Sequence, residues 1–584
     1  MNNTWLDLVD VHCLDRPQKI ALTYLKDGDE ASECLTFLEL RTFAVILAQR
    51  FQSAGLYPGD RVVISLISGP HFLIAFIACL YAGLIPVPVK TFGNRASLQK
   101  LVSVVKDAQP KALLSERCLE DALTVGEGQQ DKRWLVELSR LLWLPKPDFS
   151  ELHLAASTLG RLDRLHAAQS GDIAFLQYTS GSTADPKGVC VTHRNLVHNI
   201  TVLQCAWQVT SDDVYLTWLP LYHDMGLIGA ALLTLGSGAH CVMMPPTAFA
   251  MKPLRWLRNI DKYRATITGG PNFAYRALSE PRVVKMAGDL DLSSLRVMYC
   301  GSEPIVADTV RAFQRSYVDN KLSPNVFFPC YGMAEATLML SGGPVGREPI
   351  YASDNSGRPM NTENSEVISC GRIMCEEMLV VDPASCLPVS PGAQGEIWVR
   401  GDSIAVGYWN NPRATRDTFQ AKLASSSEHY YLKTGDLGFV RDGEVYINGR
   451  LKEVIIVNGN NLYPQDIEAS SMVAFDSAAG SRAACFSLIG GQAEEVVLFQ
   501  EVGRLEGRGL SSSSANELIN KIKYNVYHQF SIPLKEVVLV KRNSIPRTTS
   551  GKIARLACRD LYIKDKHQVL KVPRREEMIE GQNC

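Results

Sequence analysis

Hydrophobic positions in the first part of the chain alternate between helical and strand spacing. Five apolar residues recur every three or four positions and predict one face of a helix: Leu40, Phe43, Ala44, Leu47 and Phe51. Thr36 and Glu39 before them fit a capping box, and Gly55 is placed to end the helix. A β-branched run from Val62 to Ile67 predicts a strand, and residues 72–89 repeat the alternation as helix and strand.

This alternation predicts crossover units on a mainly parallel sheet, and hence an α/β fold. The 584 residues are enough for more than one domain. The pattern changes near Gly395, and Asp442-Gly443 between two strand-like runs predicts a hairpin. We predict a boundary at Lys452, which separates a large N-terminal domain with several sheets (1–451) from a small α/β C-terminal domain (452–584).

One stretch lacks periodicity. Gly342 to Glu366 is rich in Gly, Pro, Ser and Asn, and it predicts a long irregular loop inside the large domain. Structureless loops of this length are uncommon in compact domains. The segment is therefore either functional or a tolerated surface insertion.

Composition narrows the class of protein. A net charge of −1 argues against a nucleic-acid partner or an anionic membrane surface. The 15 cysteines form no C-x-x-C pair, which argues against zinc and favours a reducing compartment. The longest apolar run, 72–89, contains Gly83, Pro86 and Pro88, so it predicts a buried helix and strand rather than a membrane span. The first ten residues lack a basic signal-peptide region, and we expect a soluble cytoplasmic protein.

The segment from Tyr178 to Gly188 carries the strongest chemical signal. Its small and hydroxylated residues can bring backbone N–H groups, hydroxyls and one ammonium to a polyphosphate. The predicted phosphate contacts are Thr179, Ser180, Gly181, Ser182, Thr183 and Lys187. The Walker A pattern is absent, and the simpler alternative is a polar hairpin or linker. The Pro186-Lys187-Gly188 ending favours the phosphate loop.

With this segment the chain resembles the adenylate-forming superfamily, which includes acyl-CoA synthetases, luciferases, peptide-synthetase adenylation domains and fatty acyl-AMP ligases. The resemblance implies that family's fold, with a mobile C-terminal domain, and implies ATP and Mg²⁺ as cofactors. The family's loop usually has Gly where this chain has Ala184, a small change. Its other motifs follow in the family order over nearly the whole chain.

The resemblance assigns roles to these motifs in the large domain. Leu219 to Gly226 resembles the acyl-pocket segment, in which His223 would border the reacting carboxylate as a catalytic residue. Two further segments resemble the adenine-binding motifs and contribute Gly301, Ser302, Glu303, Tyr331, Gly332, Met333 and Ala334. Glu335 is a hard oxygen ligand for Mg²⁺, together with Thr183. The family usually has Thr, which contacts the α-phosphate, where this chain has Ala334; Thr337 lies nearby.

Three motifs near the second domain complete the resemblance. Asp436 in Thr434-Gly435-Asp436 would accept hydrogen bonds from the ribose, and Arg450 would approach the ribose or a phosphate. Lys452 occupies the hinge position. Lys552, in a segment that alone would be an ordinary surface turn, matches the catalytic lysine.

This reaction needs such residues because a carboxylate attacks the α-phosphorus of ATP, which brings two anions together. Lys552 would bridge the carboxylate and α-phosphate oxygens as charge redistributes. It would act electrostatically and not as a nucleophile. A lysine on a mobile domain also implies that the domain rotates about Lys452.

Within the superfamily the chain most resembles the fatty acyl-AMP ligases, through 218–229, 331–338 and 458–468, and through the 342–366 insertion. This implies a fatty-acid substrate, release of pyrophosphate, and transfer to an acyl carrier protein in trans. The insertion would resist the rotation needed to use CoA; the alternative is a neutral surface loop. Two other functions stay open: an acyl-CoA synthetase, and a protein that binds acyl-adenylate without turnover.

Overall fold

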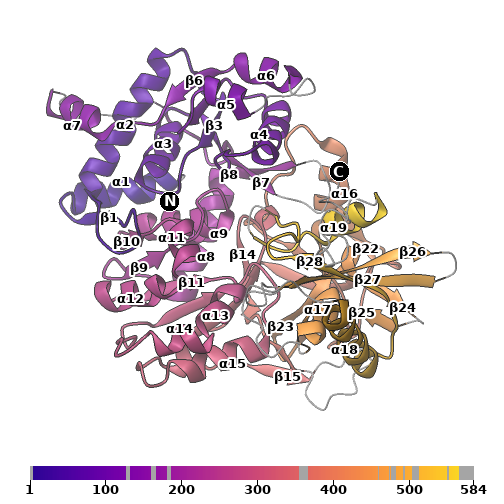
Figure 1. Cartoon of the computed structure of the whole chain (residues 1–584). Helices are drawn as coiled ribbons and strands as arrows, with labels where there is room; N and C mark the ends of the chain where they lie inside the picture. The colour runs from indigo at the N-terminus through magenta and orange to yellow at the C-terminus, as the bar shows by residue number, and fades with distance from the viewer. Residues whose placement is uncertain are drawn as a thin grey trace, which may run out of the picture.

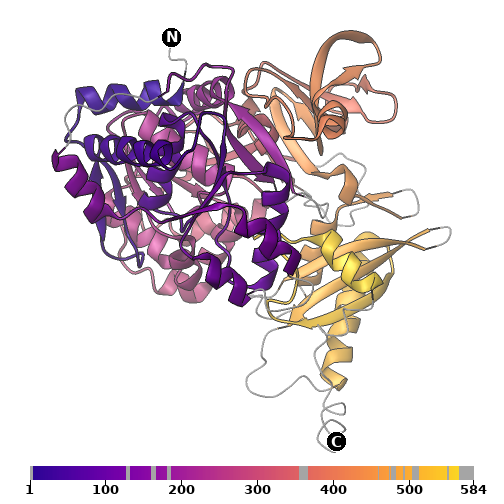
Figure 2. The ribbon, with the colours of Figure 1, turned by 90° about the horizontal axis from the view of Figure 1, so that it is seen from above.

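The computed structural model describes residues 4–125, 132–158, 166–179, 186–353, 366–457, 460–472, 474, 482–490, 493–502, 512–548 and 551–564. The chain up to about residue 450 forms a large α/β body, and the part that follows forms a smaller unit beside it (Figures 1 and 2). Among the described residues, no helix combines the length and hydrophobicity needed to cross a membrane.

The predicted alternation near the N-terminus is confirmed. Thr36 and Glu39 form a reciprocal capping box on α2 (Phe37–Ser53). The next strand and helix are β3 (Arg61–Ser65) and α3 (Pro70–Tyr81), followed by β4 (Ile85–Pro88). A four-stranded parallel sheet in the order β4-β3-β5-β6 is completed by β5 (Ala112–Ser115) and β6 (Leu142–Pro145).

The main sheet has 15 strands and two halves of different character. One half is the predicted parallel sheet, apart from its antiparallel edge strand β2. Its strands are β2 (Glu33–Thr36), β1 (Ile20–Tyr24), β10 (His240–Met243), β9 (Val214–Thr217), β11 (Ile267–Gly270), β12 (Val297–Cys300) and β13 (Phe327–Gly332).

The other half is antiparallel, and apart from the Asp442-Gly443 hairpin the sequence pattern did not predict it. It contains β14 (Met339–Gly342), β17 (Arg372–Ile373), β23 (Glu444–Arg450), β22 (Ser426–Arg441), β20 (Gly395–Arg400), β18 (Glu377–Asp382), β19 (Leu387–Pro388) and β21 (Ala421–Leu423). The predicted Asp442-Gly443 hairpin joins β22 to β23, and both turn residues have positive φ, of 54° and 77°. Such φ values suit a two-residue hairpin turn.

The other helices before residue 452 lie around these sheets (Figure 1). They are α1 (Trp5–Asp15), α4 (Arg95–Ala108), α5 (Leu119–Val125), α6 (Lys132–Ser139), α7 (Phe149–Thr158), α8 (His193–Trp207), α9 (Asp224–Gly226), α10 (Leu233–Gly236), α11 (Pro246–Met251), α12 (Leu254–Tyr263), α13 (Asn272–Leu278), α14 (Pro281–Lys285), α15 (Ala307–Ser316) and α16 (Pro412–Phe419).

The C-terminal unit has cores of its own. A three-stranded sheet is formed by β26 (Ala483–Gly490), β27 (Ala493–Val502) and β28 (Leu534–Lys541). It packs with α17 (Pro464–Met472), α18 (Ser512–Phe530) and α19 (Arg555–Ile563), while β24 (Ile455–Val457) pairs with β25 (Asn460–Leu462). Its two buried clusters begin at Ile455 and Ala484, whereas the main cluster of the large body ends at Val445. The exact domain boundary stays a prediction.

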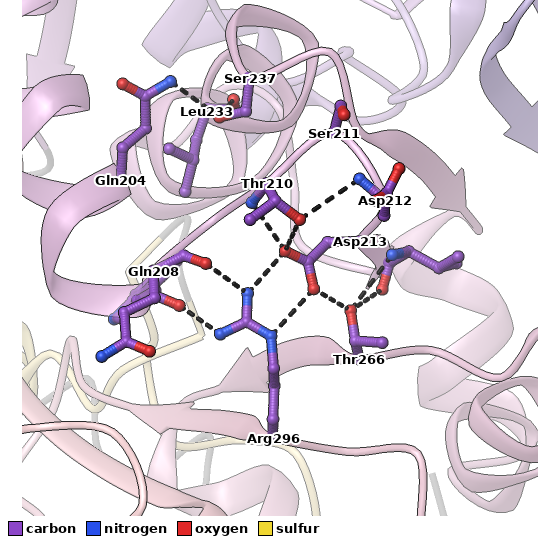
Figure 3. A network of polar contacts seen from close by, with 12 residues as sticks. Gln204, Gln208, Thr210, Ser211, Asp212, Asp213, Leu233, Ser237, Thr266 and Arg296 are labelled. Carbon is purple, nitrogen blue, oxygen red and sulfur yellow. Dashed lines mark hydrogen bonds and ion pairs between the residues drawn. The ribbon is translucent and has the colours of Figure 1, made fainter.

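An ion-pair network closes the amino ends of the parallel strands (Figure 3). Arg296, just before β12, donates to Oδ1 and Oδ2 of Asp213, at 2.9 and 2.6 Å. The same guanidinium also donates to the carbonyls of Trp207 and Gln208 at the end of α8. Asp213 further accepts from Thr266, before β11, at 2.7 Å. The network ties three strands and one helix together at the edge opposite their carboxyl ends.

The prediction of an irregular loop over 342–366 is wrong for residues 351–353 and 366, which lie in strands. β15 (Tyr351–Ser353) and β16 (Glu366–Ile368) form an antiparallel pair, with Ser353 opposite Glu366. Arg311 of α15 pairs with Glu366, and its guanidinium lies 4.1 Å from the centre of the Tyr351 ring. These contacts anchor both strands of the pair to the large body. Residues 354–365 lie outside the described part of the chain.

Candidate active site

The carboxyl ends of four parallel strands meet at one edge of the main sheet. His223 and Asp224 follow β9, Phe273 follows β11, and Glu303 follows β12, while Tyr331 lies at the end of β13. Ligands of open α/β sheets bind outside this edge. The structure therefore brings together segments that are more than 100 residues apart in the sequence.

Asp436 and Arg450 meet on neighbouring strands at this edge. They are register partners on β22 and β23, and Nε of Arg450 lies 3.1 Å from Oδ1 of Asp436. The other oxygen, Oδ2, accepts a hydrogen bond of 2.7 Å from the Tyr331 hydroxyl. Asp436 first and foremost raises the pKa of Arg450, which stays cationic. Two partners thus hold the carboxylate that is predicted to bind the ribose.

Tyr331 departs from its predicted role in one respect. The side chain is only 9% exposed, so most of its ring lies in the core. Burial, followed by the nearby Asp436 charge, raises the pKa of its hydroxyl. The phenol is therefore a hydrogen-bond donor to Asp436, and its contact with a purine stays a prediction.

Lys552 of the C-terminal unit reaches the same edge. Burial, and next the Arg450 guanidinium, lower the pKa of its ammonium group. Three carboxylates act in the opposite direction: Asp224, Glu303 and Asp436. Lys552 thus lies in the electrostatic field of the predicted ribose and adenine motifs.

Glu303 and its neighbours form a strained loop after β12. Ser302 has a positive φ of 72°, and a side chain at Gly301 would lie 2.9 Å from Sγ of Cys330. Glu303 accepts a hydrogen bond of 2.5 Å from the backbone N–H of Phe273. Burial raises the pKa of its carboxyl, whereas this N–H and Lys552 act to lower it. The loop therefore fixes a carboxylate beside the lysine.

The phosphate segment is carried by a hairpin. β7 (Ile173–Thr179) and β8 (Lys187–Thr192) are antiparallel, with Thr179 opposite Lys187. The sequence pattern did not predict β8. The two strands that flank the segment do form a hairpin, as the simpler alternative proposed. Thr192 then caps α8 through a capping box with Asn195. Ser180, Gly181, Ser182 and Thr183 lie outside the described residues.

The acyl segment has an unusual helix. α9 continues into a π-helix, η1 (Leu227–Leu232), and then into α10. Such irregular turns are frequent at functional sites. A side chain at Gly226 would lie 2.2 Å from the Pro220 carbonyl oxygen, so only glycine fits there. His223 caps α9 through its carbonyl, which accepts from the Leu227 N–H at 2.8 Å. The catalytic role of the His223 ring stays a prediction.

Gly332, Met333, Ala334 and Glu335 belong to a tight turn after β13. A side chain at Gly332 would lie 1.8 Å from the Leu338 carbonyl oxygen, which also accepts from the Met333 N–H. Ala334 begins the short 3₁₀-helix η3 (Ala334–Ala336). Thr337 is buried and its hydroxyl donates to the Ser403 carbonyl at 2.6 Å. Because its hydroxyl is already bonded, Thr337 is poorly placed to replace the threonine that the family has at the Ala334 position.

Glu335 is suited to Mg²⁺. Its side chain is partly exposed, and one oxygen accepts a hydrogen bond of 2.8 Å from the Tyr408 hydroxyl. Within the described ranges, no three His, Cys, Asp or Glu side chains are grouped to hold a metal ion by themselves. Mg²⁺ keeps several waters and binds one or two carboxylates plus substrate phosphates, so a single partly exposed carboxylate such as Glu335 is the kind of ligand it takes.

The predicted hinge lies in a short exposed turn. Lys452 is in η4 (Leu451–Glu453), directly after β23. Glu453 at the end of this turn pairs with Arg555, with a distance of 2.6 Å to Nη1. Arg555 lies three residues after Lys552 and also binds Glu468 of α17 through Nε and Nη2. The segment after the hinge is thereby fastened to the helix that follows the lysine.

Two residues have surroundings at the site that the sequence did not indicate. Asp224 lies in the quoted acyl segment but had no predicted role; burial raises the pKa of its carboxyl, while the Lys552 charge acts to lower it and the Glu335 charge to raise it. Tyr408 had no signal at all, because only the tertiary structure brings it to Glu335.

The comparisons with known proteins agree with this geometry. Residues 9–409 match the family described as AMP-binding enzyme. The chain is 34% identical to the medium-chain-fatty-acid–[acyl-carrier-protein] ligase JamA of Moorena producens, over 96% of this chain and 95% of that protein. It is 33% identical to the long-chain-fatty-acid–AMP ligase FadD26 of Mycobacterium tuberculosis, over 95% and 97%.

A solved structure is also similar. It is the fatty acyl-adenylate ligase of Legionella pneumophila, in complex with acyl adenylate and pyrophosphate. It matches with a TM-score of 0.71 and 32% identity over 96% of each chain. The chain therefore belongs to the AMP-binding enzyme family and, within it, to the fatty acyl-AMP ligases.

Proposed function

We propose that this chain uses ATP and Mg²⁺ to convert a fatty acid into an acyl-adenylate with release of pyrophosphate, and that an acyl carrier protein then accepts the acyl group. The position of Lys552 is the observation that supports acyl-adenylate formation. This cation from the C-terminal unit lies among Asp224, Glu303 and Asp436 at the carboxyl edge of the main sheet. Its positive charge is therefore available at the edge where the predicted ribose and adenine motifs meet.

The residues divide the work by charge. Asp436, held by Tyr331 and Arg450, presents its carboxylate to the ribose hydroxyls. Lys552 offers a cation where the fatty-acid carboxylate meets the α-phosphate, and stabilises the charge that develops as the phosphorus–oxygen bond to pyrophosphate breaks. Bound Mg²⁺, held by Glu335 with Thr183, would neutralise charge on the phosphates. No covalent enzyme intermediate is needed.

The Lys552 assignment is tested by Lys552→Ala. We expect fatty-acid-dependent pyrophosphate exchange to fall by about 10²–10³-fold, the size of losing one transition-state donor. Lys541→Ala, an exposed lysine of the same unit, is the control. Pyrophosphate exchange within twofold of wild type in Lys552→Ala would contradict the catalytic assignment of Lys552.

The relatives support an acyl carrier protein as the acceptor of the acyl group. JamA is named as a ligase acting on an acyl carrier protein, and it aligns over nearly the whole of this chain. Mass spectrometry of products from ATP and a fatty-acid panel, with CoA or with a phosphopantetheinylated carrier protein, tests this. We expect acyl-carrier protein and no acyl-CoA. Acyl-CoA as the main product would instead make the chain an acyl-CoA synthetase.

The insertion allows a test of the proposal that the enzyme does not use CoA as an acceptor. Because Ser353 and Glu366 are cross-strand partners, residues 354–365 can be replaced by Asn-Gly, a two-residue hairpin turn. This keeps the Arg311 contacts with Tyr351 and Glu366. We expect the shortened protein to keep adenylation and to gain acyl-CoA formation. A stable variant that adenylates but still forms no acyl-CoA would count against a role for the insertion.

A further inference from the structure

A single segment touches both halves of the nucleotide site. Residues 402–409, here called the strap, run between the turn that carries Glu335 and the strand that leaves the phosphate loop. On the first side, the Ala405 N–H donates to the Glu335 carbonyl at 2.9 Å. The Ser403 carbonyl accepts from the Thr337 hydroxyl at 2.6 Å, and the Tyr408 hydroxyl donates to Oε1 of Glu335 at 2.8 Å. Backbone and side chain of Glu335 are thus both held by the strap.

On its other side the strap binds β8. The Val406 N–H donates to the Cys190 carbonyl at 3.2 Å, and the Cys190 N–H donates to the Gly407 carbonyl at 2.9 Å. The Trp409 N–H donates to the Gly188 carbonyl at 2.7 Å. Between them, the ammonium of Lys187 lies 4.7 Å from the centre of the Tyr408 ring. One tyrosine therefore contacts the predicted metal ligand through its hydroxyl and the phosphate-loop lysine through its face.

The turn that the strap holds is strained. Thr337 has φ 66° and ψ −61°, and the Leu338 N–H donates to the Ala336 carbonyl at 2.7 Å. This is a γ-turn of the rare form with positive φ, centred on a β-branched residue. Such a conformation persists only where its surroundings over-determine it, and strain of this kind clusters at functional sites.

The chemistry of Tyr408 suits an orienting role. The residue is only 8% exposed, so its hydroxyl is largely shielded from water and is committed to Oε1 of Glu335. A single donor on Oε1 restricts the rotation of the carboxylate without neutralising it, as partners behind metal-ligating carboxylates do elsewhere.

We infer that Tyr408 is a positioning residue for the metal–nucleotide site, and that through it the strap couples the orientation of Glu335 to the location of Lys187. This inference rests on the proposed function, since it assumes that Glu335 binds Mg²⁺. It predicts that the Tyr408 hydroxyl matters for the nucleotide only when Mg²⁺ is present.

The test is binding without turnover. Isothermal titration calorimetry measures the affinity of a non-hydrolysable ATP analogue for the full chain, with and without Mg²⁺, in wild type, Tyr408→Phe, Glu335→Gln and the double variant. Tyr446→Phe is the control, because this buried ring stacks on Phe439 in another part of the sheet. Melting temperatures show whether each variant is folded.

We expect Tyr408→Phe to weaken binding by about 5–10-fold with Mg²⁺, within the range of one lost hydrogen bond, and to leave Mg²⁺-free binding unchanged. In the Glu335→Gln background, Tyr408→Phe should have no further effect. Equal weakening with and without Mg²⁺, or unchanged affinity, overturns the inference while the proposed function stands. A wild-type protein that binds no adenine nucleotide overturns both.

Discussion

The Tyr331 hydroxyl donates a 2.7 Å hydrogen bond to the buried carboxylate of Asp436, 105 residues further along the chain. Arg450 engages the other carboxylate oxygen at 3.1 Å. Asp436 is only 5% exposed, so these two partners, rather than water, set its orientation. The acceptor predicted for the ribose is thereby oriented before any nucleotide arrives.

Tyr331→Phe removes this hydrogen bond and keeps the ring. We expect the KM for ATP to rise by about 5–10-fold, within the range of one lost hydrogen bond. The KM for the fatty acid should change little. Pyrophosphate exchange at varied ATP and at varied fatty acid measures the two constants, with Tyr430→Phe, 55% exposed, as control. An ATP KM within twofold of wild type would show that Arg450 alone orients Asp436.

Arg555 should govern how firmly Lys552 is held. It binds Glu468 through Nε at 2.7 Å and Nη2 at 2.8 Å, and Glu453 through Nη1 at 2.6 Å. Burial acts to lower its pKa, but Glu468 and Glu453 outweigh it and raise the pKa. We expect Arg555→Ala to lower the kcat of adenylation about 10-fold with the KM for ATP unchanged, since a misplaced catalytic group costs rate.

Arg555→Lys distinguishes positioning from simple charge. A lysine keeps the charge but cannot form the forked pair with Glu468, so we expect only partial rescue of kcat. The exposed Arg542→Ala serves as control. Full activity in Arg555→Ala, measured by pyrophosphate exchange on a folded sample, would contradict a positioning role.

Arg296 should matter for stability and not for catalysis. Asp213 is 6% exposed and depends on Arg296, which also closes the end of α8 (Figure 3). Arg296→Ala leaves a buried carboxylate without its partner, and we expect a loss of about 3 kcal/mol in the free energy of unfolding. Urea denaturation measures it.

The matched control is Arg50→Ala, whose partner Glu151 is 65% exposed. Its loss should stay below about 0.5 kcal/mol. If the two variants were equally stable, the network in Figure 3 would contribute little. Exchange activity of folded Arg296→Ala should match wild type, because the network lies at the edge of the sheet away from Lys552.

Acid should destabilise the protein through His240. Burial, followed by Lys19, lowers its pKa from 6.5 to about 4. A neutral histidine in the folded state that is protonated in the unfolded state favours unfolding as the pH falls from 6.5 toward 4, and its stabilisation is fully present only above 6.5. At pH 5 we expect a loss of about 2 kcal/mol relative to pH 7.5.

Thermal unfolding at pH 7.5 and pH 5 tests this in wild type and His240→Gln. The glutamine variant should lose less stability on acidification, because it cannot bind the proton. An identical pH dependence in the two proteins would exclude His240 as a source of acid sensitivity.

The sequence by itself determined the local structure and the order of the motifs. The capping boxes at Thr36 and Thr192, and the turn at Asp442-Gly443, depend on hydrogen bonds and φ angles within a few residues. Such signals are complete in the sequence. The motif series from Thr179 to Lys552 likewise identified the family, because these residue types in this order suit one reaction.

Only the tertiary structure decided which residues meet. The pairs Tyr331–Asp436 and Tyr408–Glu335 join distant segments, and the antiparallel half of the main sheet and the short β15–β16 pair have no local signature. Strand partners and buried polar contacts are selected by packing and by the cost of leaving polar groups unsatisfied, which act only once the chain is compact. For the same reason Lys552, in sequence an ordinary turn residue, is placed at the site by the docking of the C-terminal unit.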